Sequence, residues 1–162
     1  MTGVLTDLPE ACERLNTVIA EGRLTRDEWS GTDEQGRETL CLLAAMSPEV
    51  AKREDAKACP AGVLPEWLAY LSVWIDDAPS NDWLGRIRRF AGVLPRLASL
   101  SAERLQRLDY ECCAIAVREA RAACDPSRDV ASLAAVDRVL ALLDRAIAGD
   151  APMAGEWAEA EA

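Results

Sequence analysis

Apolar residues recur three and four positions apart along most of this 162-residue chain, which is the spacing of one face of an α-helix. The segment 129–148 shows the clearest pattern, with an apolar stripe formed by Leu133, Val136, Leu140, Leu143 and Ile147. Similar stripes run from Asp7 to Gly22 and over 102–124, and residues typical of helix ends bound each of them. Ala and Leu are abundant and β-branched residues are sparse, which also favours helix over strand.

The most apolar stretch of the chain is Val63–Ile75, which reads VLPEWLAYLSVWI. Pro65 suits the first turn of a helix, where a missing N–H group costs nothing. A helix that is apolar almost all round is typical of a protein interior, and the stretch is shorter than the roughly twenty residues that span a bilayer. We therefore expect a buried central helix here, with Trp67 and Trp74 in the core.

Shorter elements surround this segment. A helix is expected over 37–46, after a polar loop at 30–36, and a further helix begins after Ser80. The pattern as a whole predicts an all-α, compact globular bundle of six to eight helices around the buried central helix.

The chain length of 162 residues fits one domain. We expect residues 1–149 to form a single all-α domain in which the helices 102–124 and 129–148 pack as an antiparallel pair. The acidic, Ala/Glu-rich segment 150–162 is expected to be a tail or a short helix.

The net charge of −10 is unevenly distributed. Residues 1–82 carry seven basic and sixteen acidic side chains, a net charge of −9, whereas residues 83–121 carry eight arginines and four acids, a net charge of +4. A protein that binds nucleic acid directly is usually basic, so direct nucleic-acid binding is not expected. The chain also shows neither a membrane span nor a secretory signal, and we expect it to be cytoplasmic.

The side chains that most often carry catalysis or bind metals are missing or unfavourably spaced. The chain has no histidine, which excludes Ser-His and Cys-His nucleophiles within it. Its six cysteines include no Cys-x-x-Cys pair, and no glycine-rich phosphate-binding loop occurs. The cysteines are expected to be reduced core thiols, and the sequence predicts no metal, no cofactor and no enzymatic activity.

Three acidic residues lie where the central helix ends, namely Asp76, Asp77 and Asp82. Such a cluster can bind Mg²⁺ or Ca²⁺. It can also cap the next helix or pair with nearby arginines, and this structural role is the favoured interpretation.

The arginine-rich segment that follows gives the best indication of a contact surface. Arg86 and Arg89 share one face of the expected helix, Trp83 lies nearby, and Trp29 lies close to a loop. Trp and Arg are enriched at the energetically important contacts between proteins. We therefore predict Trp83, Arg86, Arg89 and Trp29 as partner-binding residues. The alternative is a solvated helix face whose arginines pair with acidic residues of the same chain.

Three functions are compatible with these residues. The first is a non-enzymatic protein that acts by binding another protein. The second is an acidic inhibitor that mimics nucleic acid, which requires the carboxylates of residues 1–82 to lie on one surface. The third and least favoured is an enzyme that uses a carboxylate or a thiol.

The run CPAGVLPEWLAYLSVWIDDAPS, with GRETLCLLAAM before it and VREARAAC after it, resembles small helical proteins of tailed phages and prophages. No activity is associated with those proteins, so the resemblance carries over no site residues. It implies only a context: the protein would be an accessory factor in a bacterial cytosol and would bind a phage or host protein.

Overall fold

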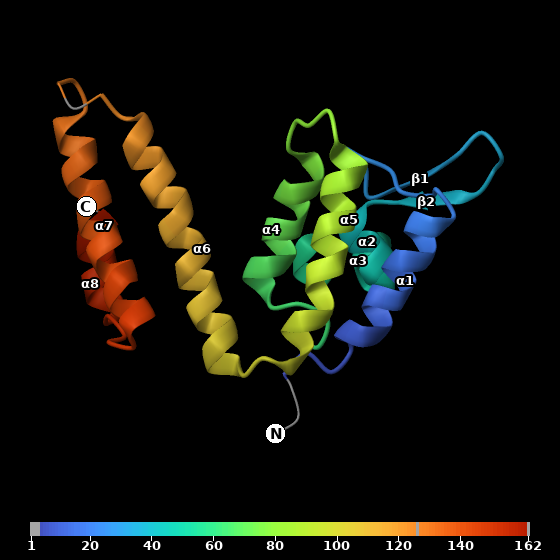
Figure 1. Ribbon diagram of the computed structural model, residues 1–162, viewed down its shortest axis with the longest axis horizontal. Helices are drawn as coiled ribbons and strands as arrows, with labels where there is room; N and C mark the ends of the chain where they lie inside the picture. The colour runs from blue at the N-terminus through green and yellow to red at the C-terminus, as the bar shows by residue number, and fades with distance from the viewer. Residues whose placement is uncertain (1–3, 126, 162) are drawn as a thin grey trace. The chain divides into compact units, whose positions relative to one another are not determined.

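The computed structural model has an all-α fold (Figure 1). It describes residues 4–125 and 127–161, which contain eight α-helices, two short 3-10 helices and one hairpin of two short strands. None of the helices in this described part is both long and apolar enough to cross a membrane. The chain divides into two compact units, Met1–Ala102 and Glu103–Ala162, whereas the sequence led us to expect a single domain over 1–149.

The first unit is organised around a short buried helix, α2. Its elements in chain order are α1 (Leu8–Ala20), β1 (Ser30–Thr32), β2 (Glu38–Leu40), α2 (Leu42–Met46), α3 (Pro48–Arg53), η1 (Ala56–Ala58), α4 (Glu66–Asp77), α5 (Trp83–Val93) and η2 (Leu94–Ser99). Every residue of α2 is buried, and α2 packs against α1, α3 and α4. The core of this unit therefore forms where these helices meet.

α1 forms where its apolar stripe predicts a helix. Pro9 lies in its first turn, and the stripe is buried against α2 and η2, with Leu8, Ala11, Cys12, Leu15 and Val18 inside. Gly22 follows the helix with a φ of 67°. Glycine adopts this left-handed conformation without strain, so it ends the helix and lets the chain turn toward the hairpin.

Residues 30–46 fold differently from the predicted loop followed by one helix. β1 and β2 pair as an antiparallel hairpin, and α2 begins only at Leu42. Oδ1 of Asp33 accepts the backbone N–H of Arg37 (2.9 Å) and so closes the turn between the strands. Cys41 then has an extended backbone, and its Sγ accepts the N–H group three residues later, which caps α2. Turn and cap hydrogen bonds therefore outweigh the helical spacing of this segment.

α4 is not the fully buried helix expected within Val63–Ile75. It packs against α2, α5 and η1 along one face, whose buried residues are Leu68, Ala69, Ser72 and Asp76. The other side reaches solvent, with exposed fractions of 74% for Trp74 and 38% for Tyr70. The prediction that Trp74 lies in the core is wrong. An apolar sequence shows that a helix can be buried on every side, but not that enough neighbours surround it.

The second unit consists of α6 (Ala102–Ala123), α7 (Val130–Ala148) and α8 (Ala154–Glu161). α6 and α7 run in opposite directions (Figure 1), and two ion pairs join them, Arg118–Asp144 and Arg121–Asp137. α8 packs on α7, and its Trp157 stacks on Tyr110 of α6 with ring centroids 6.5 Å apart. Of the two alternatives expected for residues 150–162, the structure contains the short helix.

Leu15 in α1 and Leu84 in α5 provide a matched test of the core, because Leu15 is fully buried and Leu84 is partly exposed. We expect Leu15→Ala to lower the free energy of unfolding by about 2–5 kcal/mol through lost burial and a residual cavity. Leu84→Ala should lower it by less than about 1 kcal/mol. Urea denaturation followed by circular dichroism measures both values, and equal losses would contradict the core described here.

Candidate binding site

The acidic cluster at the end of α4 contains one buried carboxylate. The exposed fraction of Asp76 is 2%, and both of its oxygens accept hydrogen bonds. Oδ2 accepts from the backbone N–H of Leu42 (3.0 Å), and Oδ1 accepts from Nε1 of Trp83 (2.8 Å). Leu42 is the first residue of α2 and Trp83 is the first residue of α5, so this carboxylate joins three helices. Burial raises the pKa of Asp76 above its ordinary value, and the hydrogen bonds offset that effect only in part.

Two arginines close the same end of α4. Nη2 of Arg26 donates to the carbonyl oxygens of Asp77 (2.8 Å) and Ala78 (3.1 Å). Nη2 of Arg86 donates to the carbonyl oxygens of Asp76 (3.3 Å) and Ala78. Guanidinium groups are favourable here because the last carbonyl groups of a helix carry partial negative charge. The described residues contain no group of three or more His, Cys, Asp or Glu side chains that could hold a metal ion. The carboxylate of Asp76 instead connects α4 to α2 and α5 through its two hydrogen bonds.

The four partner-binding residues predicted from the sequence do not share one environment. Trp83 and Arg86 are half-buried, and their polar groups bond to the end of α4. Trp29 is also half-buried and lines a small cavity of about 100 Å³ beside the buried carboxylate. Arg89 is exposed and pairs with Asp82 (3.0 Å). Among the four, Arg89 alone presents its charged group to solvent.

The sequence analysis assigned the tryptophans of α4 to the core and did not predict the aromatic residues of this helix as contacts. Trp67, Tyr70 and Trp74 lie on α4 at the spacing of one helix face, and we call them the aromatic stripe. Trp67 is half-buried, whereas Tyr70 and Trp74 are exposed. The signal that could have located the stripe is polar: Ser72 and Asp76 lie four residues apart on the opposite face. Two polar residues on one face of so apolar a helix indicate that this face is either exposed to solvent or buried with its polar groups hydrogen-bonded.

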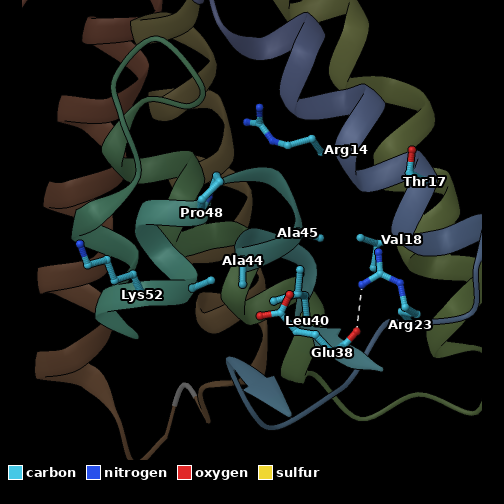
Figure 2. Close-up of a pocket in the computed structure, with 11 residues that line it drawn as sticks. Arg14, Thr17, Val18, Arg23, Glu38, Leu40, Ala44, Ala45, Pro48 and Lys52 are labelled. Atoms are coloured by element: carbon cyan, nitrogen blue, oxygen red, sulfur yellow. Dashed lines mark hydrogen bonds between the residues drawn. The ribbon is translucent and has the colours of Figure 1, made fainter. Parts of the chain in front are cut away.

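A cavity of about 490 Å³ lies in the first unit between α1, β2, α2 and α3, and Figure 2 shows its lining. We call it the apolar pocket. Its walls are formed by Val18, Leu40, Ala44, Ala45, Pro48 and Ala51. Its charged lining residues are Arg14, Arg23, Glu38 and Lys52. Thr17 also lines the pocket, so five of its eleven lining residues are polar or charged. A concave pocket of this size is typical of a ligand-binding site.

Five of the six cysteine thiols have a pKa above the ordinary value. All six are free, and burial raises the pKa of Cys41 to about 11. Burial also raises the pKa of four other thiols above the ordinary value, those of Cys12, Cys59, Cys112 and Cys113. A raised pKa keeps a thiol protonated and therefore weakly nucleophilic.

Comparison with protein-family models, curated proteins and solved structures gives no match for this chain. The resemblance to tailed-phage and prophage proteins stays a prediction. The function is therefore inferred from the geometry of the chain itself.

Replacing Asp76 with Asn tests the role of the buried carboxylate. The amide oxygen of Asn accepts one of the two N–H groups, and its NH₂ group leaves the other without an acceptor. We expect Asp76→Asn to lower the free energy of unfolding by about 1–3 kcal/mol, the typical cost of a buried unpaired donor. Chemical denaturation near neutral pH measures the loss, and an unchanged denaturation midpoint would contradict a stabilising role for the Asp76 carboxylate.

The same pair of proteins should show a defined pH dependence. Folding raises the pKa of Asp76 above 3.8, so the part of the unfolding free energy that comes from this shift is fully present below that pH and is lost as pH rises through the folded pKa. Asp76→Asn lacks this titration. The difference in unfolding free energy between the wild type and Asp76→Asn should therefore become smaller as pH rises from 3.8 through the folded pKa of Asp76. A difference that widens would show that the pKa is lowered instead.

Proposed function

We propose that this chain is a non-enzymatic protein that binds another protein through the aromatic stripe of α4. The observation that carries the proposal is the 74% exposure of Trp74 beside the exposed Tyr70. Trp and Tyr combine a large apolar surface with a polar group, and they dominate binding energy at protein interfaces. Isolated exposed apolar residues are common, but an aromatic row along one helix face is a feature of contact surfaces.

The charges of α4 indicate the chemistry of the partner. Glu66 begins the helix and Asp77 ends it, both are exposed, and their positions lie on the side of the aromatic stripe. α4 carries no Lys or Arg. A partner surface with an apolar groove and basic residues at its edges would complement this helix. On the resemblance to phage proteins, that partner would be a phage or host protein.

The competing functions have less support. An enzyme would need an activated thiol or a free buried carboxylate, but the buried thiols of Cys12 and Cys41 have raised pKa values and Asp76 is hydrogen-bonded on both oxygens. A nucleic-acid mimic would need many unpaired carboxylates on residues 1–82. Five of the sixteen acids of that segment pair with arginines of the same unit, which reduces the number of carboxylates open to a mimic: Glu10, Glu21, Asp27, Asp33 and Asp82.

Trp74→Ser tests the proposed surface. The tagged chain is used to capture proteins from a bacterial lysate, and a co-purified protein is then titrated against the purified wild type and variants. We expect Trp74→Ser to weaken that binding at least tenfold, because a central Trp commonly contributes 2 kcal/mol or more, roughly a thirtyfold effect. The stability of the variant should hardly change, since Trp74 buries little surface within the chain.

Val93→Ser is the matched control, because Val93 is an exposed apolar residue on α5 of the same unit. It should leave binding unchanged. Binding that survives Trp74→Ser but is lost at high salt would overturn the proposal in favour of the acidic mimic.

Sedimentation of the purified chain tests a different occupant. A dimer that Trp74→Ser dissociates would show that a second copy of this chain, and not a different protein, covers the aromatic stripe.

A further inference from the structure

A second apolar surface lies on the second unit, and the proposed partner surface on α4 does not account for it. It is a groove of about 450 Å³ between α6 and α7, and we call it the Ala/Val groove. All of its lining side chains are Ala or Val, so none of them carries a charge or a hydrogen-bonding group. The lining residues are Ala116, Val117 and Ala120 of α6, Ala135, Val136 and Val139 of α7, and Ala160 of α8.

The groove continues the surface on which α8 already packs. Figure 1 shows α8 beside the C-terminal half of α7, and the buried residues of α7 are Leu142, Leu143 and Ala146. The three α7 residues that line the groove each lie seven positions earlier. Seven residues make nearly two helical turns, so these residues lie on the same face of α7, about 10 Å further along its axis. The groove is therefore a second seat for a helix, next to the one that α8 occupies.

The short length of α8 explains why this second seat is open. At a rise of about 1.5 Å per residue, the 19 residues of α7 extend over about 28 Å and the 8 residues of α8 over about 12 Å. Ala116 and Ala120 of α6 are exposed beside the groove, whereas Ala114 of the same helix is fully buried. Within the described part of this unit, about 16 Å of α7 therefore has no third helix packed on it.

An arginine at the edge of the groove indicates the charge of a helix that would fit there. Arg145 of α7 pairs with Glu156 of α8. Arg138 lies seven residues before Arg145, so it stands on the same edge of α7, beside the groove. Arg138 is exposed and forms no ion pair with a described residue, although Glu159 of α8 lines a neighbouring cavity with it. Arg138 thus lacks the acidic partner that α8 supplies to Arg145.

The other edge of the groove carries the opposite charge. Glu119 of α6 lies three residues after the lining residue Ala116, so the two are neighbours on the helix surface. Glu119 is exposed and makes no ion pair within the described ranges, whereas the adjacent Arg118 pairs with Asp144 of α7. The groove therefore lies between an acidic edge on α6 and a basic edge on α7.

We propose that the Ala/Val groove binds an amphipathic α-helix of a partner protein, in line with α8. A helix of about eleven residues fills the open 16 Å. Its apolar face carries side chains of the size of Leu, because the small residues of the groove leave room for larger ones. One of its edges carries an acid for Arg138, and the other carries a base for Glu119. The groove and the aromatic stripe share no residues, so this proposal does not depend on the one for α4.

Synthetic helical peptides of about eleven residues test the proposal against the purified full chain. Three of them share an apolar face of Leu and differ at the edges, which carry Glu and Lys, Glu only, or Lys only. A fourth has the mixed composition in scrambled order. Fluorescence anisotropy should show the tightest binding for the mixed peptide, binding weaker by about two- to fivefold for the single-sign peptides, and binding weaker by about tenfold or more for the scrambled one. Equal binding of the mixed peptide and any other, or no binding, overturns the proposal.

A matched pair of variants locates the peptide. Ala120→Phe fills the groove from α6 and should weaken binding of the mixed peptide by about tenfold or more. Ala122→Phe adds the same side chain at an exposed position about 200° further around α6, and it should have no effect. Circular dichroism verifies that both variants fold. Equal weakening by the two variants overturns the placement.

Charge reversal at each edge gives a second readout. Arg138→Glu makes both edges acidic, so the Lys peptide should become the tightest binder of the three. Glu119→Arg makes both edges basic, so the Glu peptide should become the tightest. Arg107→Glu is the control, because Arg107 is an exposed arginine of α6 that does not line the groove, and it should leave the order of affinities unchanged. An order that stays the same in both edge variants overturns the proposal.

A second copy of this chain is the other occupant to be tested. Sedimentation of the full chain without peptide should show no dimer that depends on the groove. A dimer that Ala120→Phe dissociates and Ala122→Phe leaves intact would overturn the proposal in favour of a second copy. Trp74→Ser should leave peptide binding unchanged, so this proposal and the one for the aromatic stripe fail separately.

Discussion

The buried carboxylate of Asp76 is the contact on which the arrangement of the first unit depends. It accepts the first backbone N–H of α2 and the indole N–H of Trp83 at the start of α5, while it belongs itself to the last turn of α4. A buried charge without hydrogen-bond donors is costly, so these three helices have to meet at this point. Arg26 and Arg86 complete the junction by bonding to the last carbonyl groups of α4.

This junction also decides which side of α4 faces solvent. Successive residues of an α-helix are rotated by about 100°, so residues two apart point in nearly opposite directions. With Asp76 directed inward, Trp74 has to point outward, and Tyr70 and Trp67 follow it on the same face. Ser72 lies on the buried face, where its hydroxyl donates to the carbonyl oxygen of Ala69 (2.7 Å). Two polar residues of α4, Ser72 and Asp76, are therefore inside, and Trp74 is outside.

The aromatic stripe and the apolar pocket of the first unit differ in physical character. The aromatic stripe is a convex helix face with a carboxylate at each end, and it suits a protein with a complementary groove. The apolar pocket is concave and is lined by both apolar and charged residues, so it suits a small molecule. They share no residues. α2 supports both, because its alanines form one wall of the pocket and its N-terminus holds the carboxylate that orients the stripe.

The sequence by itself determines the helices α1, α6 and α7. The signals for each helix are the regular spacing of its apolar residues and the residues at its ends, and these signals are local because they involve residues only a few positions apart. It also determines that the chain has no histidine and only two lysines. Tertiary structure alone decides which face of α4 is buried, why Trp83 turns inward and where the pocket forms. The reason is that these features follow from hydrogen bonds between residues far apart in the chain, such as the 34 positions that separate Leu42 from Asp76. No local pattern encodes which distant donor satisfies a buried carboxylate.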